Sequence, residues 1–158
     1  CAMYADDHGE RVCPAFHYGV ASGTAPLFWW EDLLQPYLKT YDSVTCPSHV
    51  VLTSNWLRPG SGYANPLPFS YSRYDAIVGS GVAATNSCPS LGQFNTPSET
   101  ANVVDAKIQE FWSSNHITMG HASYGIDHRH NLQFNVVYFD GHCGSARNSN
   151  PAMKLWTR

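Results

Sequence analysis

The closing segment, residues 132–139 (LQFNVVYF), constrains the fold most, because its alternating side chains and its Val, Phe and Tyr content favour a β-strand. Asp140-Gly141 follows at once, and Asp-Gly after such a run is the strongest two-residue signal for a β-hairpin. We therefore predict a straight strand over residues 130–139, a tight turn at Asp140-Gly141 and a return strand that begins at His142.

Length and composition favour one folded domain over residues 1–158. The 158 residues are 43% hydrophobic and 13% charged, which suits a chain with a core and not a disordered segment. A net charge of −3 offers no basic surface for nucleic acid or for anionic lipid. No apolar run approaches the roughly 20 residues of a membrane helix. The chain does not begin with Met, so we expect a processed or truncated protein.

Two helices are predicted. Residues 24–41 carry a cap at Thr24 and a proline at Pro26, the first helical position. An apolar stripe has helical spacing, and Pro36 is expected to end or kink the helix. The stripe consists of Leu27, Trp30, Leu34 and Leu38. Residues 1–9 (CAMYADDHG) are typical of the end of a longer helix that stops at Gly9.

Short strands are predicted in the middle of the chain, where Gly, Pro, Ser and Tyr dominate the connecting loops. The predicted segments are Val50–Thr53, Asp75–Val78 and Ala101–Ala106.

Five cysteines are scattered without the C-x-x-C spacing of zinc or redox motifs. In a chain rich in Gly and Pro and poor in Lys, this favours structural disulfides of an exported protein. Cys1 is the expected unpaired thiol, because it lies at the chain end. The remaining four allow three pairings, which the sequence leaves open: Cys13, Cys46, Cys88 and Cys143.

Several blocks resemble one family. His130, nine residues and then Asp140-Gly141 are similar to the H-x9-D-G signature of bacterial type IV prepilin-like proteins. Three further blocks follow the family's order: AMYADDHGERV, which is similar to the end of a pilin helix, WWEDLLQPYLKTYDSVTCPS, with a Cys-Pro-Ser turn, and PSETANVVDAK, a strand ending in Asp.

The resemblance covers about a third of the chain and implies an α+β, pilin-like head. Its expected parts are a helix remnant, one short helix and a small antiparallel sheet that ends in a C-terminal β-hairpin. The implied protein is exported to the cell surface or beyond, assembles with copies of itself, as in a pilus or a pseudopilus of type II secretion, and is not an enzyme. Family members begin with a leader and a long apolar helix that this chain lacks, so contact with a membrane is expected only through that missing helix or through a lipid on Cys1.

The histidine-rich end also raises the question of a metal site. In an extended segment His128 and His130 point to one side, and Asp140 and His142 flank the turn glycine. A straight strand holds His130 about 30 Å from Asp140, so the two pairs share an ion only if residues 128–133 fold back. We expect no cofactor, with a structural Ca²⁺ or Zn²⁺ at these four residues as the alternative.

Two other functions remain open. Exposed aromatic residues suit a secreted module that binds carbohydrate or another surface, and the residues available are Trp29, Trp56, Tyr63, Tyr71 and Tyr74. A metal-dependent hydrolase is the third alternative. No nucleophile motif or phosphate-binding loop supports catalysis.

Overall fold

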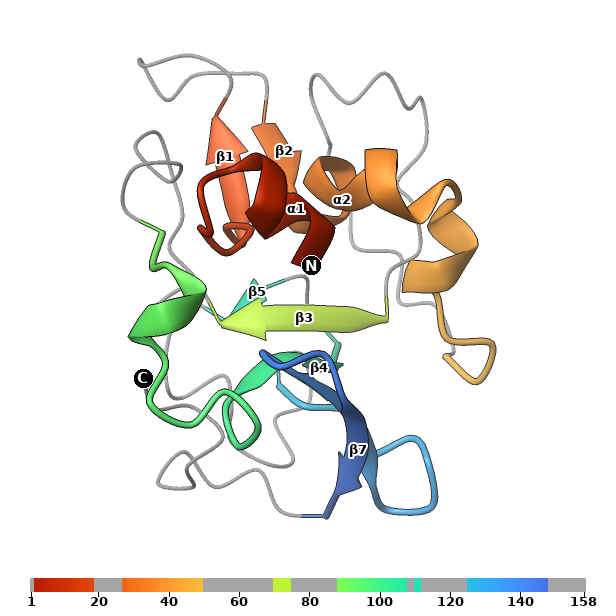
Figure 1. The fold of residues 1–158 in the computed structure, drawn as a ribbon. Coiled ribbons are helices and arrows are strands. Elements are labelled where there is room, and N and C mark those ends of the chain that lie inside the picture. Colours follow the sequence, from red (N-terminus) through yellow and green to blue (C-terminus); the bar gives the residue numbers. More distant parts are fainter. Residues whose placement is uncertain are drawn as a thin grey trace.

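The computed structural model describes residues 2–18, 27–49, 70–74, 88–107, 110–111 and 125–147, and these residues form a mixed helix-and-sheet domain of the predicted α+β class (Figure 1). The helices are α1 (Ala2–Asp7) and α2 (Trp30–Leu38), and the 3-10 turns are η1 (Tyr41–Val44) and η2 (Leu91–Gln93). The strands are β1 (Phe16–Tyr18), β2 (Leu27–Trp29), β3 (Tyr71–Tyr74), β4 (Ala101–Asp105), β5 (Glu110–Phe111), β6 (Phe134–Tyr138) and β7 (Cys143–Ala146).

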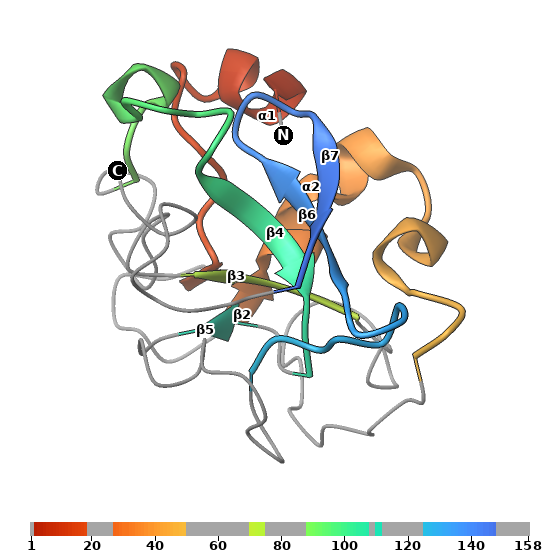
Figure 2. The same cartoon turned by 90° about the horizontal axis from the view of Figure 1, so that it is seen from below.

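The main sheet has the order β5-β3-β4-β6-β7, and a separate hairpin pairs β1 with β2. Neighbours in the main sheet are antiparallel except β3 and β5, which run parallel. In the second view β4, β6 and β7 run side by side, with β7 at the edge (Figure 2). Asp105, the last residue of β4, lies opposite Tyr71 of β3.

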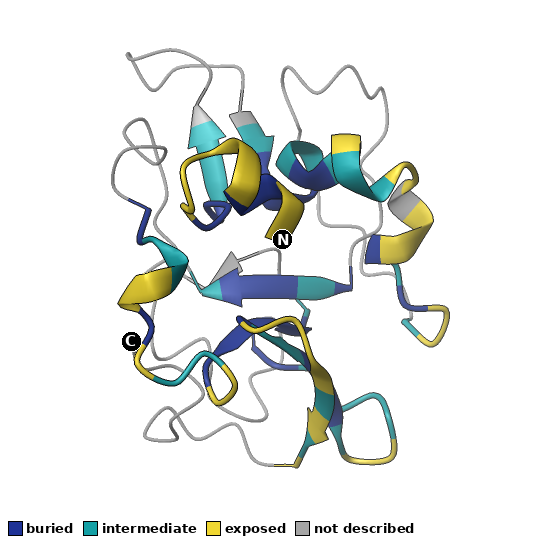
Figure 3. Cartoon of the chain, in the orientation of Figure 1, coloured by how far each residue is buried: buried dark blue, intermediate teal, exposed yellow. Residues whose placement is uncertain are grey.

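Both faces of β4 are covered, so buried residues follow one another along this strand. Val103 and Val137 belong to one core cluster with Tyr4, Trp30 and Leu34 of the helices. Their neighbours Val104 and Val136 belong to a second cluster that contains Phe94, Phe134 and Phe139. Successive strand residues point to opposite faces, and both faces here are buried, as the blue colour of β3 and β4 indicates (Figure 3). This explains why β4 is buried at every position.

The predicted helix at the start of the chain is present as α1. Tyr4 and Ala5 are buried, whereas the side chain of Met3 is 56% exposed. The helix ends where predicted, because Gly9 adopts a positive φ of 63° and Glu10 donates its backbone N–H to the carbonyl of Ala5.

The second helix starts later than predicted. Leu27 belongs to β2, and α2 begins only at Trp30, with Asp32 accepting the backbone N–H of Trp29. Pairing with β1 therefore overrides the helical spacing at the start of the segment. Pro36 lies inside the last turn and does not end the helix before Leu38. Thr24 and Pro26 lie outside the described residues.

The predicted C-terminal hairpin is confirmed, with a longer turn. β6 and β7 pair from Phe134–Ala146 to Val137–Cys143. Four residues, 139–142, connect β6 to β7, and within this loop Phe139 is buried, with its ring stacked on Phe94 at 3.9 Å. Gly141 adopts a φ of 93°, which suits glycine in this type of bulged turn.

Of the other predicted strands, Ala101–Ala106 is confirmed as β4, whereas Val50–Thr53 and Asp75–Val78 lie outside the described residues. β3 was not predicted. Among the residues that the structure describes, no helix has the length and apolar character needed to cross a membrane.

The predicted straight strand over residues 130–139 is wrong at its start, because the chain folds back before β6. His130 and Gln133 exchange both backbone hydrogen bonds, at 3.2 and 3.1 Å. The two residues between them, Asn131 and Leu132, have positive φ values of 54° and 63°. This is the backbone of a tight two-residue turn, for which Asn is well suited and Leu is not.

Replacing Leu132 with glycine is expected to stabilise the domain by about 0.5–1 kcal/mol, because glycine adopts a positive φ without strain. Little packing is lost, since the side chain is 77% exposed. Urea denaturation measures the change. Gln133→Gly is the matched control and should destabilise by about 0.5–1 kcal/mol, because Gln133 does not need a positive φ. A loss of stability in Leu132→Gly would contradict the strain argument.

Candidate functional site

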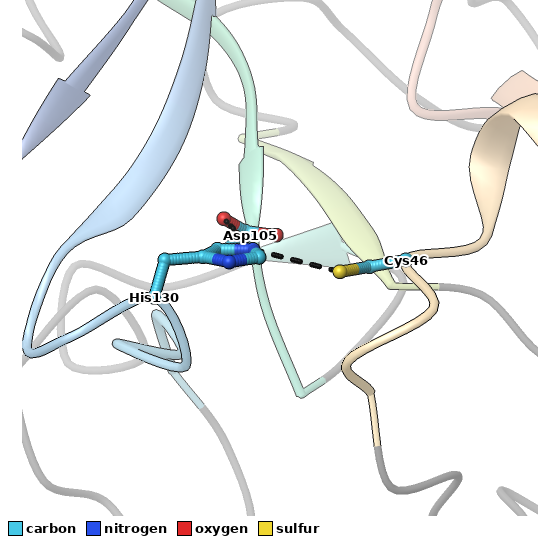
Figure 4. A group of neighbouring side chains, drawn as sticks. All are labelled: Cys46, Asp105 and His130. Carbon is cyan, nitrogen blue, oxygen red and sulfur yellow. Dashed lines mark hydrogen bonds and ion pairs between the residues drawn. The ribbon is translucent and has the colours of Figure 1, made fainter.

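Three side chains from distant parts of the sequence converge at one end of the sheet. They are Cys46, just after η1, Asp105, at the end of β4, and His130, in the turn before β6 (Figure 4). Nε2 of His130 lies 3.5 Å from Sγ of Cys46 and 3.4 Å from Oδ2 of Asp105. One potential ligand atom from each residue lies within 4.8 Å of the other two.

The backbone fixes each of these residues. Cys46 donates its N–H to Oγ of Ser70 at 2.7 Å, which ties the segment after η1 to the start of β3. Asp105 is held by the pairing of β4 with β3, and its Oδ2 accepts the backbone N–H of Asn135 at 2.6 Å. The tight turn at residues 130–133 then brings His130 back over the end of β4. Local hydrogen bonds thus hold the cluster in place.

The cluster is buried on one side and open on the other. Cys46 is buried, the Asp105 side chain is 0% exposed and the His130 side chain is 30% exposed. Burial raises the pKa of Asp105 above its usual range, and the N–H of Asn135 and the charge of Arg129 oppose that rise. Solvent therefore reaches the cluster from the His130 side.

Arg129 supplies the nearest fixed positive charge. Its Nη1 lies 3.8 Å from Oδ1 of Asp105 and its Nη2 lies 3.1 Å from a carboxylate oxygen of Asp127. Nη2 also donates to the carbonyl of Ala106 at 2.7 Å. Arg129 is thus shared between two carboxylates, and the closer one, that of Asp127, is outside the cluster.

The arrangement differs from a nucleophile–base–acid relay. In such a relay one imidazole nitrogen contacts the nucleophile and the other contacts the carboxylate. Here the same nitrogen, Nε2 of His130, faces both Sγ of Cys46 and Oδ2 of Asp105. His130 therefore does not bridge the two partners through its two ring nitrogens. The geometry instead suits three groups that share one central atom.

The structure separates the four predicted metal ligands. His130 joins Cys46 and Asp105, whereas the ring of His128 packs edge-on against Phe134 at 5.2 Å. Asp140 and His142 form their own exposed pair in the hairpin turn, with Nδ1 of His142 2.7 Å from Oδ1 of Asp140. The backbone N–H of His142 also donates to that oxygen at 3.1 Å and holds the pKa of Asp140 below its usual range. This pair stabilises the turn locally.

The four cysteines predicted to form disulfides are free thiols in the structure: Cys13, Cys46, Cys88 and Cys143. The structure therefore selects none of the three pairings, and disulfide formation stays a prediction. Cys1 lies outside the described residues. Burial raises the pKa of the Cys13 thiol to about 12, so this group is protonated and unreactive at neutral pH.

The aromatic residues proposed for carbohydrate binding do not form an exposed group among the described residues. Trp29 is 5% exposed, and Tyr71 and Tyr74 of β3 are half-buried. Trp56 and Tyr63 lie outside the described residues.

Of the three residues in the cluster, the sequence predicts only His130 as a metal ligand, and not Cys46 or Asp105. Both residues nevertheless lie in sequence blocks that carry the family resemblance. Cys46 begins the Cys-Pro-Ser turn, Asp105 ends the strand of the Pro-Ser-Glu-Thr block, and His130 begins the H-x9-D-G motif. Three separate blocks therefore each supply one side chain to the same cluster.

No family model matches the chain, and no curated protein or solved structure matches it significantly.

Proposed function

We propose that this chain is the pilin-like head of an exported structural subunit, which assembles with copies of itself into a filament or pseudopilus-like structure at the cell surface. The observation that carries the proposal is the meeting of three family-like blocks at Cys46, Asp105 and His130. Blocks that are far apart in the sequence therefore contribute to one side-chain cluster in the fold. The fourth block contains α1, which shares a core cluster with the sheet through Tyr4.

The proposal assigns assembly to this protein and no catalysis. It involves neither nucleic acid nor a membrane, unless a preceding helix or a lipid on Cys1 provides an anchor. In a pilin-like subunit the first helix is the element that contacts other subunits. The exposed residues of α1 are Ala2, Met3, Asp6 and Asp7, and Met3, which is 56% exposed, is the large apolar one among them.

Light scattering over a range of protein concentrations and negative-stain electron microscopy test the proposal. The protein is expected to form larger assemblies as its concentration rises, and Met3→Glu should weaken this association at least tenfold. Leu132→Glu is the control, because it also places a charge on an exposed apolar side chain, but in the turn at residues 130–133. A wild-type protein that stays monomeric at every concentration would contradict self-assembly. Equal loss in both variants would remove α1 as the assembly surface.

A further inference from the structure

We propose that Cys46, Asp105 and His130 bind one Zn²⁺ ion through Sγ, Oδ2 and Nε2. This ligand set differs from the histidine pairs expected from the sequence. It also goes beyond the proposed assembly function, because the ion would bind whether or not the protein forms filaments.

The distances between the ligand atoms support a common ion. Zn²⁺ lies about 2.0–2.2 Å from nitrogen and oxygen ligands and about 2.3 Å from sulfur, so ligand atoms at tetrahedral angles are about 3.3–3.7 Å apart. The two distances from Nε2 of His130 agree with this range: 3.5 Å to Sγ of Cys46 and 3.4 Å to Oδ2 of Asp105. The third distance, from Sγ of Cys46 to the Asp105 carboxylate, is within 4.8 Å.

The chemistry of the ligands favours zinc over calcium. Thiolate, imidazole and carboxylate together are typical of zinc sites, whereas Ca²⁺ takes six to eight oxygen ligands. The cluster contains a single carboxylate. The histidine nitrogen and the cysteine sulfur would contribute little to a calcium site, so we exclude calcium from this proposal.

The burial and charge of Asp105 also favour a bound cation. Its side chain is 0% exposed, and Oδ1 has no hydrogen-bond partner among the described residues. A buried carboxylate with an unsatisfied oxygen is costly, and an adjacent cation offsets that cost. Arg129 lies 3.8 Å from Oδ1 and does not complete a hydrogen bond there. An ion bound at Oδ2 would lie next to this carboxylate and add to the positive charge of Arg129.

Three protein ligands leave a fourth tetrahedral position. His130 is the only partly exposed member of the cluster, so this position is expected on its solvent side, where water can occupy it. The ion would then connect the segment after η1, the end of β4 and the turn before β6.

Isothermal titration of the metal-free protein with Zn²⁺ tests the site. We expect binding of one ion per chain, weakened at least tenfold in His130→Gln and unchanged in the matched control His142→Gln. Both variants remove a histidine of the same C-terminal region, and both side chains are at least partly exposed, so neither should prevent folding. Binding that is lost in His142→Gln and kept in His130→Gln would overturn the assignment in favour of the hairpin turn.

Two further measurements identify the sulfur ligand. Substitution of Co²⁺ for Zn²⁺ should give a thiolate-to-metal charge-transfer band, which should vanish in Cys46→Ser. Mass spectrometry of the intact protein under native conditions should show one Zn²⁺ ion per chain in the wild-type protein and none in Cys46→Ser. No zinc binding by the wild-type protein, or a charge-transfer band that persists in Cys46→Ser, would contradict the proposal.

Discussion

Replacing Arg73 with alanine is expected to destabilise the domain by about 3–5 kcal/mol, a large part of the stability of an ordinary domain. Arg73 is the largest fully buried side chain among the described residues. Its guanidinium donates to the carbonyls of Cys13 and Pro14 and to Oδ1 of Asn102. Alanine would leave these buried acceptors without their donor and open a cavity between β3, β4 and the segment before β1.

Urea denaturation of the reduced, metal-free protein measures this change. Arg11→Ala is the matched control, because Arg11 also donates to a backbone carbonyl, that of Cys88 at 2.8 Å, but from an exposed position. It should cost no more than about 1 kcal/mol. Similar losses in the two variants would show that the burial of Arg73 does not set the size of the effect.

Replacing Asp105 with alanine is expected to cost about 2–3 kcal/mol even without metal, because the backbone N–H of Asn135 loses its acceptor and Arg129 loses a neighbouring carboxylate. Asp105→Asn keeps an oxygen that can accept from Asn135. Since burial raises the pKa of Asp105, the fold tolerates the carboxylate charge only at a cost. The asparagine variant should therefore lose less than half as much stability as the alanine variant.

Denaturation in the presence of a chelator separates this effect from zinc binding. Asp127→Ala is the control for the ion pairs, because Asp127 also pairs with Arg129 but its side chain is 21% exposed. A loss of no more than about 1 kcal/mol is expected there. If Asp105→Asn proved as unstable as Asp105→Ala, the ion pairs rather than the bond from Asn135 would hold this corner of the fold.

The sequence predicted the elements whose signals are local. The closing hairpin, β4 and the end of α1 each carry a pattern or a stop residue that the structure retains. β3 was missed because its four residues, Tyr71–Tyr74, contain few apolar side chains and follow a Gly- and Pro-rich stretch. Pairing with β4 makes it a strand, and that pairing is invisible in a local pattern.

The cluster was harder to predict because its members are far apart in sequence. Asn131 permits a bend, yet the strand signal beyond it favours an extended segment. The turn could not be predicted from Leu132, because leucine rarely adopts the positive φ that this residue has. Once the chain folds back, His130 lies beside Asp105 instead of leading into a strand that ends at Asp140. One local turn therefore decides which residues His130 meets.

The convergence of these three segments also bears on the unfolded chain. Any bond that joins Cys46 to Asp105 closes a long loop, and one that joins Asp105 to His130 closes a second loop. The entropy that an unfolded chain loses through such a closure increases with loop length, so the longer loop contributes more. An ion at this point would act as a reversible cross-link, and its removal would restore conformational freedom to both stretches at once.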